Sequence, residues 1–74
     1  MTEKGKETLE YIYSYAEKNQ LLPTLQEIAD ALYISKPSAN LRLRRLEKAG
    51  YIERVFNSAR YRVKGLKYVR VKND

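Results

Sequence analysis

Polar and positively charged side chains are concentrated between residues 35 and 48, where their types and spacing are suited to hydrogen bonding with an anionic polymer. Asn40 can pair with adenine through two hydrogen bonds, and Ser38 can bond to the edge of either base. Arg42 and Arg44 can each pair with guanine or contact a phosphate, and the sequence does not rank the two. Base reading in a major groove requires such side chains near the start of a helix, with cations beside them. The segment therefore predicts a helix that enters a major groove.

Two predicted helices, joined by a short connector, position this segment. Thr24 and Glu27 have the spacing of a capping box, so a helix is expected to begin at about Leu25. Ser35 provides a second N-cap, and Pro37 suits the first turn of the next helix. This order is typical of a helix-turn-helix. The apolar positions that share one face of the earlier helix are Ile28, Ala29 and Leu32.

The second of these helices has an apolar face and a cationic face. Ala39, Leu43 and Leu46 recur at helical spacing and are predicted to be buried. Gly50 suits the left-handed backbone that follows a helix end. The residues expected on the opposite face or its flanks are Pro37, Leu41, Arg44, Arg45 and Lys48.

A further helix is predicted from about residue 2 to residue 20, before the break at residues 21–23. Gly5 costs about 1 kcal/mol inside a helix, so the start is expected to fray toward Lys6. The stripe predicted to face the core consists of Leu9, Ile12, Tyr13 and Ala16.

Beyond Gly50 the pattern changes from helical to extended. Two runs of β-forming residues, at 51–56 and 61–63, are separated by a turn at 57–59 and predict a β-hairpin. A later run at 66–71 is either a third strand or a terminal extension. A third strand that completes the sheet of this domain is favoured, because a two-stranded sheet alone is only marginally stable. The predicted fold is therefore α+β, a winged helix-turn-helix in which a hairpin wing lies beside the third helix. The polar residues at the tip and flanks of the wing are Asn57, Ser58, Arg60 and Arg62.

The composition limits the function further. The chain has 74 residues, which predicts a single domain over residues 1–74. It contains no cysteine and no histidine, so we expect no enzyme activity, no cofactor and no metal site. The lack of cysteine and of any long apolar run favours a cytoplasmic protein with no membrane contact.

The net charge of +6 is unevenly distributed along the chain. Residues 1–34 carry three lysines and six acidic residues, whereas residues 35–74 carry twelve lysines or arginines and three acidic residues. Segregation of this kind creates a positive face that attracts polyanions. Double-stranded DNA is the expected partner.

Several short motifs resemble the N-terminal DNA-binding domain of LexA-type repressors over nearly the whole chain. These are Leu-Pro-Thr at 22–24, Glu-Ile-Ala at 27–29, the serine-rich start of the third helix, and Leu-Glu-Lys-Ala-Gly-Tyr-Ile at 46–52. The last motif is common among bacterial winged helices and supports the fold more than the family. The resemblance implies that the third helix reads bases in the major groove while the wing contacts the DNA backbone. It also implies a bacterial or phage transcriptional regulator, of the repressor kind.

Carried over to this sequence, the resemblance implicates Ser35, Lys36, Ser38, Asn40 and Arg42 in the helix, and Asn57, Ser58 and Arg60 in the wing. The residues predicted to contact DNA are, in full, Ser35, Lys36, Ser38, Asn40, Leu41, Arg42, Arg44, Arg45, Asn57, Ser58, Arg60 and Arg62.

LexA-type repressors also carry a C-terminal latent peptidase that dimerises the protein, and this sequence ends at Asp74 before any such domain. Self-cleavage is therefore not expected of this polypeptide. Unless the chain is a fragment of a longer protein, tight binding requires a homodimer or a cooperating protein. The run at 67–71 is one candidate for a pairing edge, since an exposed strand is a template for another strand.

Two alternatives remain open at the level of sequence. Leu41 is expected on a wet face, where it either contacts a thymine methyl group or forms a protein-binding patch with Tyr33, Tyr11 or Tyr15. The second case corresponds to a winged helix that binds another regulator or a polymerase. Non-specific DNA binding is a further possibility.

Overall fold

The computed structural model describes residues 2–54 and 61–63. At Arg54 it describes the backbone only. Helices α1 (Glu3–Asn19), α2 (Leu25–Leu32) and α3 (Lys36–Lys48) are followed by strands β1 (Ile52–Arg54) and β2 (Tyr61–Val63). Three helices with a two-stranded antiparallel sheet form a winged helix-turn-helix, as predicted. The features predicted at 55–60 and 66–71, which include the hairpin turn and the possible third strand, lie outside the described residues.

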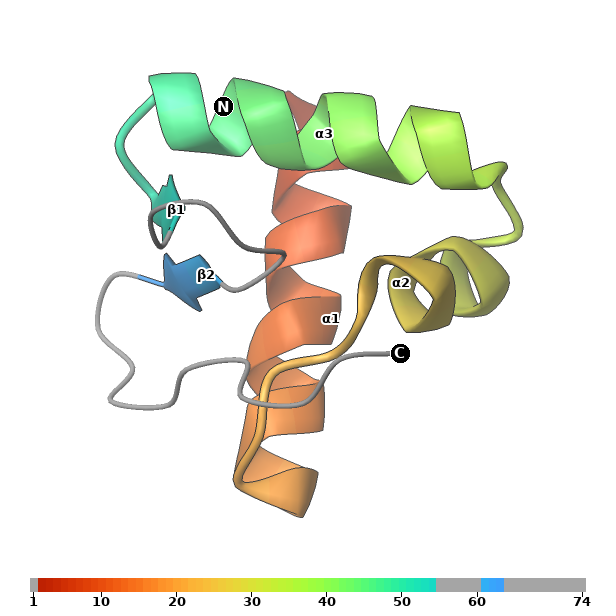
Figure 1. Cartoon of the computed structure of the whole chain (residues 1–74), viewed down its shortest axis with the longest axis vertical. Coiled ribbons are helices and arrows are strands. Elements are labelled where there is room, and N and C mark those ends of the chain that lie inside the picture. Colours follow the sequence, from red (N-terminus) through yellow and green to blue (C-terminus); the bar gives the residue numbers. More distant parts are fainter. Residues whose placement is uncertain (1, 55–60, 64–74) are drawn as a thin grey trace.

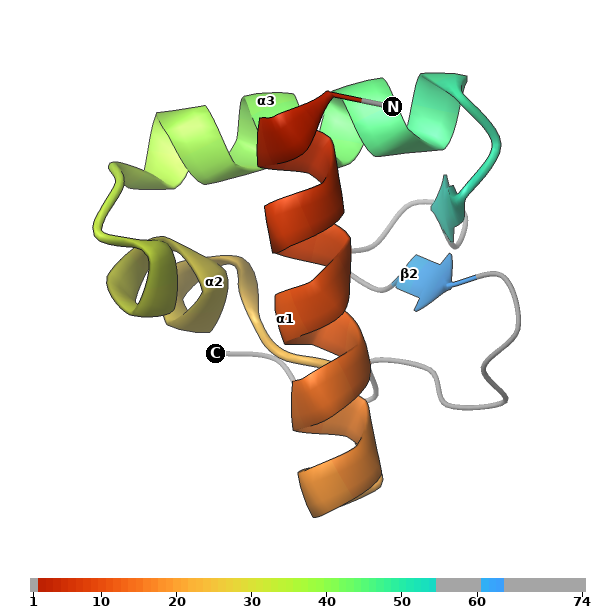
Figure 2. The ribbon, with the colours of Figure 1, turned by 180° about the vertical axis from the view of Figure 1, so that it is seen from behind.

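Helix α3 crosses the N-terminal part of α1, with α2 on one side and the hairpin on the other (Figures 1 and 2). Within residues 2–54 and 61–63, twelve buried side chains from the helices, the strands and the α1–α2 connector form one hydrophobic core. This arrangement leaves the side of α3 that faces away from α1 uncovered by the other described elements.

Helix α1 begins earlier than the glycine at its start predicts. The Thr2 hydroxyl accepts a hydrogen bond from the Gly5 backbone amide at 3.0 Å, and this cap fixes the first turn from Glu3 onward. The expected fraying toward Lys6 is therefore not observed, because the cap stabilises a turn that contains glycine. The helix ends at Asn19 and is followed by its C-cap residue Gln20, whose φ of 55° lies in the left-handed region.

The buried stripe of α1 differs from the predicted one at one position. Leu9, Ile12 and Ala16 are buried as predicted, but Tyr13 is 37% exposed. Thr8 is fully buried instead, and its hydroxyl donates to the Lys4 carbonyl at 2.8 Å. The buried stripe is thereby rotated away from Tyr13, and the prediction for that residue is wrong.

The capping box of α2 is confirmed in both directions. The Glu27 amide donates to Thr24 Oγ1 at 3.0 Å, and the Thr24 amide donates to Glu27 Oε1 at 2.7 Å. At the other end, the Ile34 amide donates to the Ala29 carbonyl at 3.0 Å across Tyr33. Tyr33 adopts a φ of 57°, a left-handed conformation that glycine or asparagine usually occupies. Because this turn is tight, α3 begins only a few residues after α2 ends.

Helix α3 has the ends that its sequence predicts. The Ser38 amide donates to Ser35 Oγ at 3.2 Å, and Pro37 lies in the first turn. After the helix, Gly50 has a φ of 93° and the Tyr51 amide donates to the Leu46 carbonyl at 2.9 Å, which is a Schellman motif. The side chains of α3 that are buried are Ala39, Leu43 and Leu46, as predicted.

The base of the wing is anchored to the helical core. Strands β1 and β2 pair antiparallel, with Ile52 opposite Val63. Tyr61 is 3% exposed, and its hydroxyl donates to the Pro23 carbonyl at 2.6 Å. This bond connects β2 to the α1–α2 connector and holds the hairpin beside α3.

Candidate nucleic-acid interface

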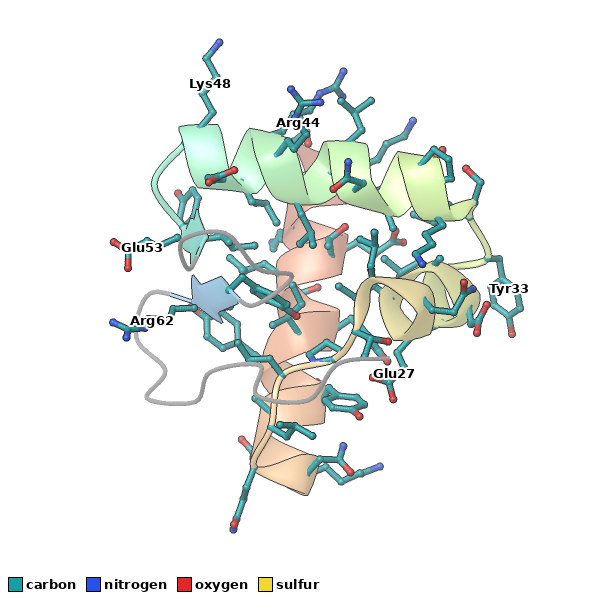
Figure 3. The ribbon with its side chains drawn as sticks, viewed as in Figure 1. Glu27, Tyr33, Arg44, Lys48, Glu53 and Arg62 are labelled. Atoms are coloured by element: carbon teal, nitrogen blue, oxygen red, sulfur yellow. The ribbon has the colours of Figure 1, made fainter. Side chains whose placement is uncertain are left out.

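The candidate interface is the outward face of α3, opposite the face that packs on the core. Figure 3 shows Arg44 and Lys48 extending away from the body of the domain. The first turn of α3 contains no acidic residue, so the positive end of the helix dipole favours an anion there. The exposed residues of α3 are Lys36, Pro37, Ser38, Leu41, Arg44, Arg45 and Lys48.

The two serines at the start of α3 have different roles. Ser35 caps the helix, and its hydroxyl also donates to the Ser38 hydroxyl at 2.9 Å. Both residues are exposed, and Ser38 lies on the first turn of the helix. Asn40 is on the flank of α3 and is half-buried. These polar groups are therefore near the N-terminal half of the helix, where base contacts are made in helix-turn-helix proteins.

Arg42 is not part of this outward face. Its guanidinium Nη1 donates to Glu7 Oε1 at 2.8 Å and to Thr8 Oγ1 at 3.2 Å, both on α1. The Arg42 side chain is only 15% exposed, whereas that of Glu7 is 58% exposed. The structure thus separates Arg42 from Arg44, because helical rotation turns position 42 toward α1, whereas Arg45 lines a hollow with Arg42 beside the start of α1 and another with Leu41.

Leu41 lies near the centre of the outward face. It is 46% exposed, whereas Leu43 and Leu46 on the same helix are each 3% exposed. Leu41 lines a shallow, open hollow together with Arg44, Arg45, Glu47 and Lys48. The residues one and two helical turns after Leu41 on this face, Arg44, Arg45 and Lys48, are therefore all cationic.

Two of the three tyrosines predicted to share a surface with Leu41, Tyr11 and Tyr15, are on α1. The rings of Tyr11 and Tyr15 lie 6.1 Å apart on α1, and the Tyr15 hydroxyl donates to Glu27 Oε2 at 2.8 Å. Burial raises the pKa of the Tyr11 phenol above its ordinary value of 10.0, and the nearby Glu27 and Asp30 charges add to that shift. Tyr33 is 95% exposed at the turn between α2 and α3.

Two contacts between distant segments of the chain had no signal in the sequence. The capping box indicates that one Glu27 oxygen is used within α2, but nothing in the pattern predicts that the other oxygen binds Tyr15. The Arg42–Glu7 pair likewise joins residues 35 positions apart. The sequence indicates only that the two helices carry side chains of opposite charge.

The described part of the wing carries one of the predicted contact residues. Arg62 is exposed and lies directly opposite Glu53 in the strand pair. Figure 3 shows both side chains extending to the same side of the hairpin, in a direction different from Arg44 and Lys48. The other predicted wing contacts, Asn57, Ser58 and Arg60, lie outside the described residues.

Over residues 2–54 and 61–63, no group of three or more acidic, histidine or cysteine side chains is arranged to hold a metal ion. None of the helices in this part of the chain is long and apolar enough to cross a membrane.

Comparison with known proteins agrees with the fold and the predicted resemblance. Residues 1–61 match the family described as the LexA DNA binding domain. LexA repressors from Thermotoga maritima and Thermotoga petrophila are each 43% identical to this chain over 54 residues. That alignment covers 73% of this chain but only 27% of each repressor. The chain thus belongs to the LexA DNA-binding domain family.

Proposed function

We propose that this chain is a sequence-specific binder of double-stranded DNA that acts as a transcriptional repressor. The main support is the outward face of α3, which is exposed to solvent and carries Leu41 together with Arg44, Arg45 and Lys48. The helix that presents this face begins at the Ser35 N-cap. A helix with these features fits a major groove, where polar groups near its start reach bases and cations contact phosphates.

The proposed contacts divide by chemistry. Ser38 and Asn40 read base edges, and Arg44 pairs with guanine or a phosphate. Arg42 is a positioning residue, since its guanidinium binds Glu7 on α1. The residues proposed to bind the DNA backbone are Ser35, Lys36, Arg45, Asn57, Ser58, Arg60 and Arg62.

A single domain of this size buries a small interface on DNA, so we propose that useful affinity requires two copies on a two-fold site or a cooperating protein. The alternative of a purely protein-binding domain has less support. It relied on Leu41 sharing a surface with Tyr33, Tyr11 or Tyr15. Tyr11 and Tyr15 are on α1, the helix that packs against the other side of α3, and only Tyr33, at the turn before α3, is left as an exposed aromatic candidate among these three.

Selection of bound duplexes from a random pool tests the proposal, followed by salt titrations of the best duplex and a scrambled one. We expect an enriched motif, and half-sites about 10 bp apart if two copies bind together. Equal, strongly salt-dependent binding to both duplexes would restrict the function to backbone electrostatics. No binding at low salt would overturn the proposal.

A further inference from the structure

Leu41 is an apolar group in the middle of a charged surface. The other two leucines of α3 are buried, and Leu41 is half-exposed although the core lies on the opposite side of the same helix. Ser38, Arg44, Arg45 and Lys48 are three, four or seven positions away, so they flank Leu41 on one face. Leu41 is thus near the centre of the outward face of α3.

The surrounding charges restrict what Leu41 can contact. An apolar protein surface placed over Leu41 would also remove water from Arg44, Arg45 and Lys48, at a large energetic cost. A DNA major groove supplies phosphates for those cations at its edges. On its floor, the apolar group that standard bases present is the C5-methyl group of thymine.

We propose that Leu41 contacts the C5-methyl group of a thymine and sets the preference for that base pair. This inference rests on the proposed DNA-reading function of α3. Because 5-methylcytosine carries its methyl group at the same ring position, the contact also predicts that methylated cytosine is preferred over cytosine at that base pair.

The experiment replaces each thymine of the selected duplex in turn with deoxyuridine, which removes only the methyl group. Dissociation constants are measured for the wild-type chain and for Leu41→Ala. At one thymine of each half-site we expect deoxyuridine to weaken wild-type binding about fourfold, the effect of one buried methyl group. Leu41→Ala should bind the thymine and deoxyuridine duplexes equally at that position.

A matched variant separates this contact from electrostatics. Arg44→Met should retain the deoxyuridine effect, because it leaves Leu41 in place, while its affinity falls overall. Cytosine and 5-methylcytosine at the same position provide a second comparison, in which the wild type should prefer the methylated base and Leu41→Ala should not. Thermal unfolding of Leu41→Ala checks that the half-exposed position tolerates alanine.

The outcomes distinguish the two proposals. If the wild type prefers the selected duplex but no thymine shows a deoxyuridine effect, the Leu41 contact is refuted and the proposed function stands. An undiminished deoxyuridine effect in Leu41→Ala has the same meaning. If the wild type binds selected and scrambled duplexes equally, the proposed function itself fails.

Discussion

Arg42 on α3 and Glu7 on α1 form an ion pair with a distance of 2.8 Å between Arg42 Nη1 and Glu7 Oε1. The same guanidinium nitrogen donates to the hydroxyl of the buried Thr8, which in turn donates to the Lys4 carbonyl. The contact joins the helix proposed to read DNA to the helix on which it rests. Arg42 therefore fixes the position of α3 on α1.

Removing the charge of Arg42 should affect stability more than the electrostatics of DNA binding. We expect Arg42→Met to lower the free energy of unfolding by about 1 kcal/mol, because a partly buried charged contact is lost. The slope of log affinity against log salt should not change. Urea denaturation and binding titrations over a range of salt concentrations measure the two effects.

Arg44→Met is the matched control, since Arg44 is exposed on the outward face of the same helix. It should leave stability within about 0.5 kcal/mol and reduce the salt slope by about 1. An equal reduction of the slope in both variants would show that Arg42 also contacts DNA.

Tyr33 has a backbone conformation that is unfavourable for a residue with a Cβ atom. Its φ is 57°, and its side chain is 95% exposed, so Tyr33→Gly should relieve strain without loss of packing. We expect a gain of about 0.5 to 1 kcal/mol, which corresponds to a rise of several degrees in the melting temperature. Tyr33→Ala keeps the Cβ atom and should give no such gain. The prediction fails if the two variants melt at the same temperature.

The buried hydroxyl of Tyr61 should contribute to stability through the Pro23 carbonyl. Tyr61→Phe removes the 2.6 Å hydrogen bond and leaves a buried carbonyl without this donor. We expect a loss of about 1 to 3 kcal/mol in the free energy of unfolding, measured by chemical denaturation. Tyr33→Phe makes the same chemical change on an exposed ring and should be neutral. A neutral Tyr61→Phe would mean that water satisfies the carbonyl.

Base reading and backbone binding should respond differently to mutation. Asn40→Ala should change which sequences are preferred, because Asn40 is proposed to bond to a base edge. Arg60→Ala should weaken all sequences alike and lower the salt slope by about 1. Both variants are compared by repeating the duplex selection and the salt titration. Equal losses on every sequence for both would contradict the division between helix and wing.

Much of the local structure follows from short stretches of sequence. The Thr24–Glu27 capping box, the Ser35 cap and the left-handed Gly50 were all predictable, because each depends on residues only a few positions apart. The buried face of α3 was predictable for the same reason, since helical periodicity determines which side chains share a face.

The tertiary structure decided which face of each helix meets a neighbour. Periodicity alone placed Tyr13 in the core and did not distinguish Arg42 from Arg44, because both choices depend on where another helix packs. The face of α1 that packs on the core includes Thr8 and not Tyr13. Because α1 packs against α3, Arg42 lies close enough to Glu7 to form an ion pair. Local sequence thus determined where the elements begin and end, whereas long-range packing determined which cations remain on the proposed DNA-binding face.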